Sequence, residues 1–315
     1  MMVIIVGPVM AAENLYTNGR FLYTACNEKI VLVGVNRMVT YWDRTGSSLS
    51  EIAQTGANAV RLVALTSDSA ADLNVWLKQS IDNHMVPIPE LHDATGNLAM
   101  VPQMVDWWVR PDIVDVLKKH RRYVIINIAN EASGDCSGNV SNFVSTYTTA
   151  IQRIRNAGLM MPLLIDGPCW AHDTTGLRNA ASSLYSADPN RNLIFSNHFY
   201  GKDQSGGLIS FDGQQAHLQT EIAAWVATGL PFLWGEFSNY NPPIDYLSLI
   251  NLSNASEIGW LAWSWHGNTE SILDMSNNAT YNGLYNWGLE VAVTDADSIK
   301  NTAVRPASLS NMGCC

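Results

Sequence analysis

The sequence contains few charged residues, and positive charge is the scarcer kind. Only 15% of its 315 residues are charged, and 18 Lys and Arg stand against 28 Asp and Glu, which gives a formal net charge of −10. Proteins that bind nucleic acid rely on clustered Lys and Arg to contact phosphates. We therefore expect no nucleic-acid partner.

Long apolar runs, metal-type cysteine spacings and nucleotide-binding motifs are also missing. A membrane-spanning helix needs about 20 apolar residues, and no segment approaches that length, so no membrane association is expected. The five cysteines lack the spacing of zinc sites, and we expect neither a metal ion nor an organic cofactor. No GxGxxG motif follows the first predicted strand, which argues against a dinucleotide-binding fold.

The first twelve residues are apolar and end in small side chains. Val9 and Ala11 are placed as at a signal-peptidase site, although no basic segment precedes the apolar run. We interpret residues 1–12 as a signal peptide, complete or truncated at its start, which predicts a secreted, extracellular protein with one domain over residues 13–315. The alternative is an apolar strand that plugs the bottom of that domain.

Short runs rich in β-branched residues alternate with longer amphipathic segments along the chain. This alternation is typical of parallel strands joined by helices. Helices are predicted over residues 72–84 and 140–158, among others. The eight predicted strands end at Asn36, Leu65, Asp93, Glu131, Pro168, Tyr200, Phe237 and Trp265. Eight strand–helix units without a Pro/Ser-rich linker predict an α/β fold, a single (β/α)8 TIM barrel, rather than an open doubly wound sheet.

Polar and aromatic side chains gather near the ends of the predicted strands. In a (β/α)8 barrel the C-terminal ends of the strands share one face, so residues from different strands meet in one cleft. These residues are Arg61, His92, Asp93, Asn130, Glu131, His198, Tyr200, Glu236 and Trp265. A single polar residue at a strand end marks only the start of a loop, whereas nine together predict a functional site.

Two cysteines follow neighbouring strands of the predicted barrel. Cys136 lies beyond the fourth strand and Cys169 beyond the fifth. In a secreted protein these two residues could therefore form a disulfide.

Two glutamates end apolar strands that lie three strands apart. Glu131 follows VIINIAN and Glu236 follows FLWG, so the two carboxylates would face each other across the barrel mouth. Hydrolysis of a glycosidic bond needs such a pair, one carboxyl group to protonate the leaving oxygen and one on the other side of the anomeric carbon. The alternative for either residue alone is a surface carboxylate that caps the following helix.

The motifs around these glutamates have a recognisable pattern. It comprises the pair Asn130-Glu131, the triplet Gly235-Glu236-Phe237, and the segments GANAVRL, LHDATG, NIANE and GWLAWSWHGN. The pattern resembles glycoside hydrolase family 5 of clan A, and in particular subfamily 8, whose characterised members are endo-β-1,4-mannanases. The resemblance extends from about residue 31 to residue 303.

The resemblance implies a role for each of these residues. Glu131 would be the general acid/base and Glu236 the nucleophile of an endo-acting retaining enzyme. Arg61 would keep the Glu236 carboxylate ionised, Tyr200 would donate to it, and Asn130 would bind the 2-hydroxyl of the sugar. The other implied substrate-binding residues are His92, His198, Trp170 as an aromatic wall on the leaving side, and Trp265 as the platform beneath the sugar, with Trp263 on the other side of the strand or deeper.

The sequence departs from the family pattern at three places that affect substrate selection. Ala132 replaces an aromatic residue after the Asn-Glu pair, the first loop reads NRMVTYWD, and GKDQSGG replaces an acidic segment after the sixth strand. An endo-β-1,4-glucanase therefore remains the alternative within the enzymes, and a non-catalytic carbohydrate-binding barrel is the alternative from another class. The expected partner is a β-linked polysaccharide, namely mannan, glucomannan or cellulose, bound by a monomer.

Overall fold

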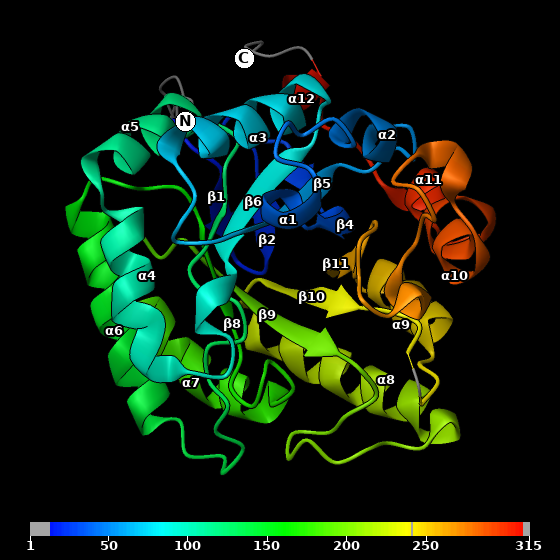
Figure 1. Ribbon diagram of the computed structural model, residues 1–315. Helices are drawn as coiled ribbons and strands as arrows, with labels where there is room; N and C mark the ends of the chain where they lie inside the picture. Colours follow the sequence, from blue (N-terminus) through cyan, green and yellow to red (C-terminus); the bar gives the residue numbers. More distant parts are fainter. Residues whose placement is uncertain (1–12, 241, 311–315) are drawn as a thin grey trace, which may run out of the picture.

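The computed structural model describes residues 13–240 and 242–310, and the predicted signal peptide at residues 1–12 lies outside this range. Eight parallel strands close into a barrel in chain order, with β11 paired back to β4, and helices surround it (Figure 1). The barrel strands are β4 (Val33–Arg37), β5 (Ala59–Ala64), β6 (Val86–Leu91), β7 (Ile126–Asn127), β8 (Leu163–Asp166), β9 (Leu193–Phe199), β10 (Phe232–Phe237) and β11 (Gly259–Ala262). The predicted (β/α)8 barrel is confirmed.

Several strands are shorter than the sequence pattern predicted. Strand β7 has only 2 residues, and β11 ends at Ala262, three positions before Trp265. Glu131 therefore lies in the turn that follows β7, where its φ angle is 42°.

The helices follow the strands as predicted. The segments expected at 72–84 and 140–158 correspond to α3 and α6. The α-helices are α1 (Val39–Trp42), α2 (Leu49–Ala53), α3 (Ala70–Asp82), α4 (Val101–Trp108), α5 (Pro111–Lys119), α6 (Ser141–Asn156), α7 (Thr174–Ala187), α8 (Phe211–Thr228), α9 (Tyr246–Ala255), α10 (Asn286–Leu289), α11 (Ile299–Thr302) and α12 (Ala307–Ser310). Shorter turns are η1 (His92–Ala94), η2 (Leu98–Met100), η3 (Ser271–Leu273), η4 (Tyr281–Gly283) and the π-helical η5 (Glu290–Thr294).

Local sequence explains where the longer helices begin and end. Ser69 and Asp72 form a capping box at the start of α3, which satisfies backbone N–H groups that have no partner within the helix. Gly158, with a φ angle of 81°, follows the end of α6 and allows the left-handed turn that leaves it.

Side-chain alternation along β5 separates the core from the interior of the barrel. Val60, Leu62 and Ala64 belong to the main hydrophobic cluster between the strands and the surrounding helices. Successive side chains of a strand point to opposite faces. Arg61 therefore points into the barrel, where its side chain has no exposed surface.

A small antiparallel sheet covers the N-terminal end of the barrel. Its strands are β1 (Tyr16–Asn18), β2 (Phe21–Tyr23) and β3 (Lys29–Ile30). Leu22 and Ile30 of this sheet pack with residues near the starts of the barrel strands, including Val86, Ile194 and Leu233. Apolar side chains pack together at this end of the barrel. The C-terminal strand ends, which carry the polar residues, lie at the opposite face.

Cys136 and Cys169, which the sequence suggested could pair, form a disulfide that joins the segments that follow β7 and β8. Among the described residues, no helix combines the length and the apolar character that crossing a membrane requires.

Candidate active site

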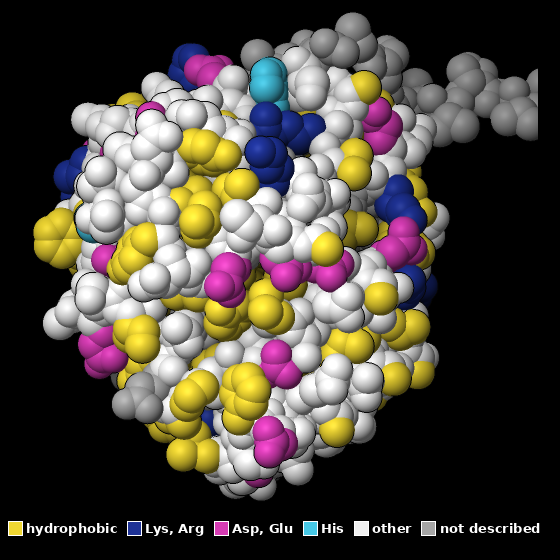
Figure 2. All heavy atoms as spheres, turned by 90° about the vertical axis from the view of Figure 1, so that its right-hand side faces the viewer, with side chains coloured by type: hydrophobic (Ala, Val, Ile, Leu, Met, Phe, Trp, Pro, Cys, Tyr) yellow, Lys and Arg dark blue, Asp and Glu magenta, His cyan; other side chains and the backbone are white. Residues whose placement is uncertain are grey.

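A cavity of about 590 Å³ opens at the C-terminal ends of the barrel strands. Figure 2 shows the face toward which the β9 and β10 arrows of Figure 1 point, with hydrophobic and acidic side chains lying together across its middle. The residues that line the cavity are His92, Asn130, Glu131, Trp170, His172, Tyr200, Lys202, Leu208, Glu236, Tyr240, Pro242, Trp263 and Leu273. The strand ends thus form one polar and aromatic cleft.

The buried Arg61 is the centre of the hydrogen-bond network beneath this cavity. Its guanidinium donates to Oε1 of Glu236 over 2.8 Å and to Oδ1 of Asn130 over 2.7 Å. It also donates to Asp166 on β8, and to Asn36 and Asn127. Burial lowers the pKa of Arg61, but the surrounding carboxylates outweigh that effect and raise it. The site therefore contains a fixed positive charge directly below Glu236.

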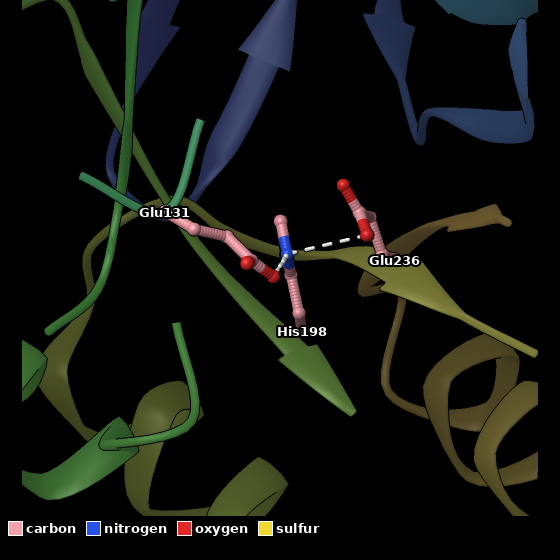
Figure 3. A group of neighbouring side chains, drawn as sticks. All are labelled: Glu131, His198 and Glu236. Atoms are coloured by element: carbon pink, nitrogen blue, oxygen red, sulfur yellow. Dashed lines mark hydrogen bonds and ion pairs between the residues drawn. The ribbon is translucent and has the colours of Figure 1, made fainter. Parts of the chain in front are cut away.

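Glu131 and Glu236 approach each other across the cavity with His198 between them (Figure 3). Nδ1 of His198 lies 2.6 Å from Oε1 of Glu131 and 3.5 Å from Oε2 of Glu236. One oxygen of each glutamate and a ring nitrogen of His198 all lie within 4.8 Å of one another. In retaining glycosidases the two carboxyl groups are about 5–5.5 Å apart, and in inverting ones about 6.5–9.5 Å. The close approach matches the retaining geometry.

The carboxylates around His198 determine its charge. Burial lowers the pKa of His198, but the negative charges of Glu236, Asp166 and Glu131 outweigh this and raise it to about 9. Burial raises the pKa of Glu131, and the hydrogen bond and charge of His198 bring it below its ordinary value. At neutral pH the imidazolium of His198 therefore lies beside an ionised Glu131.

Glu236 is held by two donors. Tyr200 donates its hydroxyl proton to Oε2 over 2.8 Å, and Arg61 donates to the other oxygen. Burial raises the pKa of Glu236, and the charges of His198 and Arg61 act in the opposite direction. Arg61 thus favours the ionised form as predicted, although burial leaves the pKa of Glu236 above its ordinary value.

His92, Asn130 and Trp170 also line the cavity as predicted, whereas Asp93 does not and accepts hydrogen bonds from the backbone N–H and the hydroxyl of Thr66. Nδ1 of His92 lies 2.9 Å from Oε1 of the buried Glu90, and the negative charge of Glu90 raises the pKa of His92 against the lowering effect of burial. The amide nitrogen of Asn130 donates to Thr95 over 2.9 Å. Trp170 lines the cavity with 43% of its surface exposed.

The predicted position of Trp265 is wrong. Trp265 is fully buried, does not line the cavity, and donates its indole proton to the carbonyl of Ala279 over 2.8 Å. Trp263 lines the cavity instead, and its ring stacks with His92 at 5.9 Å between centroids and 16° between planes. Strand β11 ends at Ala262, so the alternation of side chains along a strand does not extend to these two positions.

Several residues of the site were not found from the sequence. His172 follows the fifth strand and contacts the backbone of His198 over 3.1 Å. Glu90 and Asp166 are buried carboxylates within strands, and Asp166 accepts from the backbone N–H of Glu131 over 3.2 Å. The remaining wall residues come from loops without a periodic pattern, namely Lys202, Leu208, Tyr240, Pro242 and Leu273.

Glu131, His198 and Glu236 are also a donor set that a metal ion could contact, because their ligand atoms lie within 4.8 Å of one another. However, the positive charge of Arg61 already contacts Glu236 over 2.8 Å. A cation at this place would be repelled by that charge.

Comparison with known proteins identifies the family. The family model described as "Cellulase (glycosyl hydrolase family 5)" matches residues 25–269. The chain belongs to glycosyl hydrolase family 5. It is therefore a glycoside hydrolase.

Individual members of family 5 resemble the chain over most of its length. A mannan endo-1,4-beta-mannosidase of Streptomyces lividans is 33% identical over 88% of this chain and 73% of its own. A second one, from Salipaludibacillus agaradhaerens, is 30% identical over 91% of this chain and 93% of its own. The mannotriose complex of Thermomonospora fusca beta-mannanase has 28% sequence identity and a TM-score of 0.84, covering 95% of this chain and 100% of that chain.

Proposed function

We propose that this family 5 enzyme is an endo-β-1,4-mannanase that hydrolyses mannan and glucomannan with retention of configuration. The observation that carries the proposal is the close pair of Glu131 and Glu236, with Glu236 bound by Arg61 and Tyr200. The relatives named as mannanases favour mannan as the substrate.

The first chemical step forms a bond from Glu236 to the sugar. Its carboxylate attacks the anomeric carbon while Glu131 gives a proton to the leaving oxygen, and the glycosidic bond breaks. Glu131 must be protonated for this step. His198 holds a proton 2.6 Å from the Glu131 carboxylate and can supply it as the leaving oxygen gains charge.

The second step reverses the roles of acid and base. Glu131, now ionised, takes a proton from a water molecule, and that water attacks the anomeric carbon and releases Glu236. Two inversions at one carbon return the β configuration. Glu131 then returns that proton to His198, so both glutamates and His198 end the cycle in the state in which they began.

Aromatic and amide side chains around the carboxylates hold the polysaccharide. Trp263, stacked with His92, offers a flat face beneath the sugar whose bond is cleaved. Asn130, adjacent to Glu131, offers its amide to the 2-hydroxyl. Trp170 and Leu208 line the cavity with large exposed surfaces, 43% and 65%, which allows contact with sugars beyond that bond and thus endo action.

We propose that the enzyme acts as a monomer outside the cell. Both catalytic glutamates and their donors come from one chain. The apolar residues 1–12 and the Cys136–Cys169 disulfide both support secretion, because disulfides persist in oxidising compartments. Expression with the native N-terminus tests this: the proposal requires export to the medium with the first residues removed.

The substrate assignment is tested by measuring the release of reducing ends from mannan, glucomannan and carboxymethylcellulose side by side. We expect mannan or glucomannan to be hydrolysed faster. Equal or faster turnover of the cellulose substrate would assign the enzyme as an endo-β-1,4-glucanase. Binding without hydrolysis of any of these substrates would leave a non-catalytic carbohydrate-binding barrel.

A further inference from the structure

We propose that the Cys136–Cys169 disulfide positions Trp170, and through Trp170 determines how tightly the enzyme binds the leaving part of its polysaccharide. The inference rests on the proposed action on a β-1,4-linked glycan. The disulfide lies beside the cleft and outside the catalytic network of Arg61, so its contribution is separable from the chemistry.

The backbone that carries Trp170 has an unusual conformation. Cys169, Trp170 and Ala171 have φ angles of 55°, 50° and 59°, so three consecutive residues with side chains lie in the left-handed region. Such residues are costly to hold there and remain only where the surrounding structure fixes them. The direction of the Trp170 side chain therefore depends on what holds this turn.

Two links attach the turn to the segment that follows Glu131. The disulfide joins Cys169 to Cys136, and the backbone N–H of Trp170 donates to the carbonyl of Ser133 over 2.8 Å. On the other side, the carbonyl of Ala171 accepts from the backbone of His198 over 2.8 Å. Cutting the disulfide removes the only covalent link among these and leaves the left-handed turn less constrained.

The indole of Trp170 rests on two glycines. A Cβ atom at Gly96 would lie 2.7 Å from its Nε1, and a Cβ atom at Gly134 would lie 2.9 Å from its Cζ2. Both distances are below van der Waals contact, so the indole can lie here only because neither position has a side chain. We call the surface formed by Gly96 and Gly134 the indole seat. Trp170 keeps 43% of its surface exposed and lines the cavity.

The same disulfide supports the next wall of the cleft. A Cβ atom at Gly206 would lie 3.6 Å from Sγ of Cys169 and 3.9 Å from Sγ of Cys136. Gly206 belongs to a loop whose two ends, Lys202 and Leu208, pair with each other and line the cavity. The disulfide thus lies behind two adjacent parts of the cleft wall.

Trp170 lies on the side of Glu131. Trp170 follows β8, the neighbour of β7, and its seat includes Gly134, three residues after Glu131. Glu131 protonates the leaving oxygen, so the wall beyond it faces the sugars that leave. The disulfide should accordingly affect binding of long substrates more than the rate of bond cleavage.

The test compares the double variant Cys136→Ser, Cys169→Ser with the wild type on two substrates. For manno-oligosaccharides long enough to cross the cleft, we expect KM to rise roughly three- to tenfold, the range expected from losing one aromatic contact. For a mannobiosyl fluoride, whose leaving group does not extend to Trp170, we expect kcat to remain unchanged. A fall in melting temperature with both KM values unchanged would show a purely structural disulfide and overturn the proposal.

A double-mutant cycle separates an effect through Trp170 from a general one. In a Trp170→Ala background, removal of the disulfide should raise KM little further, because residues that act as one unit are not additive. If the two changes, loss of the disulfide and Trp170→Ala, had fully additive effects on the free energy derived from KM, the proposal would be overturned.

Gly134→Ala provides a second probe if the cysteine variant does not fold. It keeps the disulfide but places a methyl group in the indole seat, so KM for the long substrates should rise, and an unchanged KM would contradict the proposal. If the wild type hydrolyses cellulose faster than mannan, all three measurements use cello-oligosaccharides and a cellobiosyl fluoride in place of the mannose-based substrates. A preference for cellulose would therefore defeat the substrate assignment and leave this test intact.

Discussion

Arg61 donates to Oε1 of Glu236 over 2.8 Å at a place where neither side chain has more than 5% of its surface exposed. A buried charge pair of this kind loses little to screening by solvent, and removing Arg61 leaves Glu236, Asp166 and Glu90 buried without the cation that lies beside all three. The pair therefore links the ionisation of the nucleophile to the stability of the barrel.

Arg61→Met should lower kcat by about 10²- to 10³-fold, the effect of removing one strong donor from a charged catalytic group. Without the cation, the pKa of Glu236 rises further, so the acidic limb of the kcat/KM profile should move to higher pH. The variant should also lose about 3–5 kcal/mol of stability. An acidic limb at its wild-type position would show that Arg61 does not tune Glu236.

Glu131→Ala and Glu236→Ala should behave differently with an activated aryl glycoside. The leaving group of this substrate needs no proton, so Glu131→Ala should form the glycosyl-enzyme and then stall until azide attacks in place of water. The azide product should keep the β configuration after two inversions, whereas any azide product of Glu236→Ala should be α. Nuclear magnetic resonance of the products decides, and an α product from Glu131→Ala would reverse the two assignments.

The stability of the enzyme should depend on pH through His198. Its pKa is raised from 6.5 to about 9 in the folded protein, so the charged ring stabilises the fold fully below pH 6.5, and this contribution disappears as pH rises through about 9. Urea unfolding of wild type and His198→Asn at pH 6 and above pH 9 should show a stability difference that shrinks by about 3 kcal/mol. A difference independent of pH would mean that His198 is neutral in the folded protein.

The two tryptophans after β11 should give opposite results. Trp263→Ala removes a cavity wall and should lower kcat/KM on polysaccharide by about tenfold or more with little change in melting temperature. Trp265→Ala empties a fully buried site and should cost about 3–5 kcal/mol of stability. Trp263→Phe and Trp265→Phe, which keep an aromatic ring at each position, are the matched controls. If Trp265→Ala folded as stably as the wild type and lost only activity, Trp265 would be the sugar platform after all.

Treatment with a chelator should leave activity unchanged, since two carboxylates provide both the proton and the nucleophile. Assay after dialysis against EDTA, with re-addition of single divalent ions, measures this. Loss of activity that one particular ion restores would assign a metal to Glu131, His198 and Glu236.

The fold and the meeting of Glu131 and Glu236 in one cavity were predictable because both depend on patterns along the chain. Apolar strand segments alternating with amphipathic helices give the barrel, and the position of a residue at a strand end gives its place at the cleft. Glu131 and Glu236 satisfy that rule, and so do Asn130 and Tyr200.

The rest of the site depends on contacts that the pattern does not contain. Glu90 and Asp166 lie inside strands that are otherwise apolar, and their partners follow from strand register, as in the pairing of Glu90 with Asn127. Trp263 lines the cavity in place of Trp265 because β11 ends earlier than the sequence pattern indicated. Lys202 and Leu208 lie in a loop whose course is determined by its neighbours.

Arg61 binds partners from four other barrel segments: Asn36 on β4, Asn127 and Asn130 on and after β7, Asp166 on β8 and Glu236 on β10. A folding intermediate in which only strands β4 to β8 are paired would contain Arg61 and Glu131 but would lack Glu236, the proposed nucleophile, which lies on β10. Catalytic activity should therefore return last during refolding, after the fluorescence of the buried tryptophans, and no fragment from either half of the barrel should hydrolyse the substrate alone. In this enzyme, the recovery of catalytic activity therefore measures the closure of the barrel.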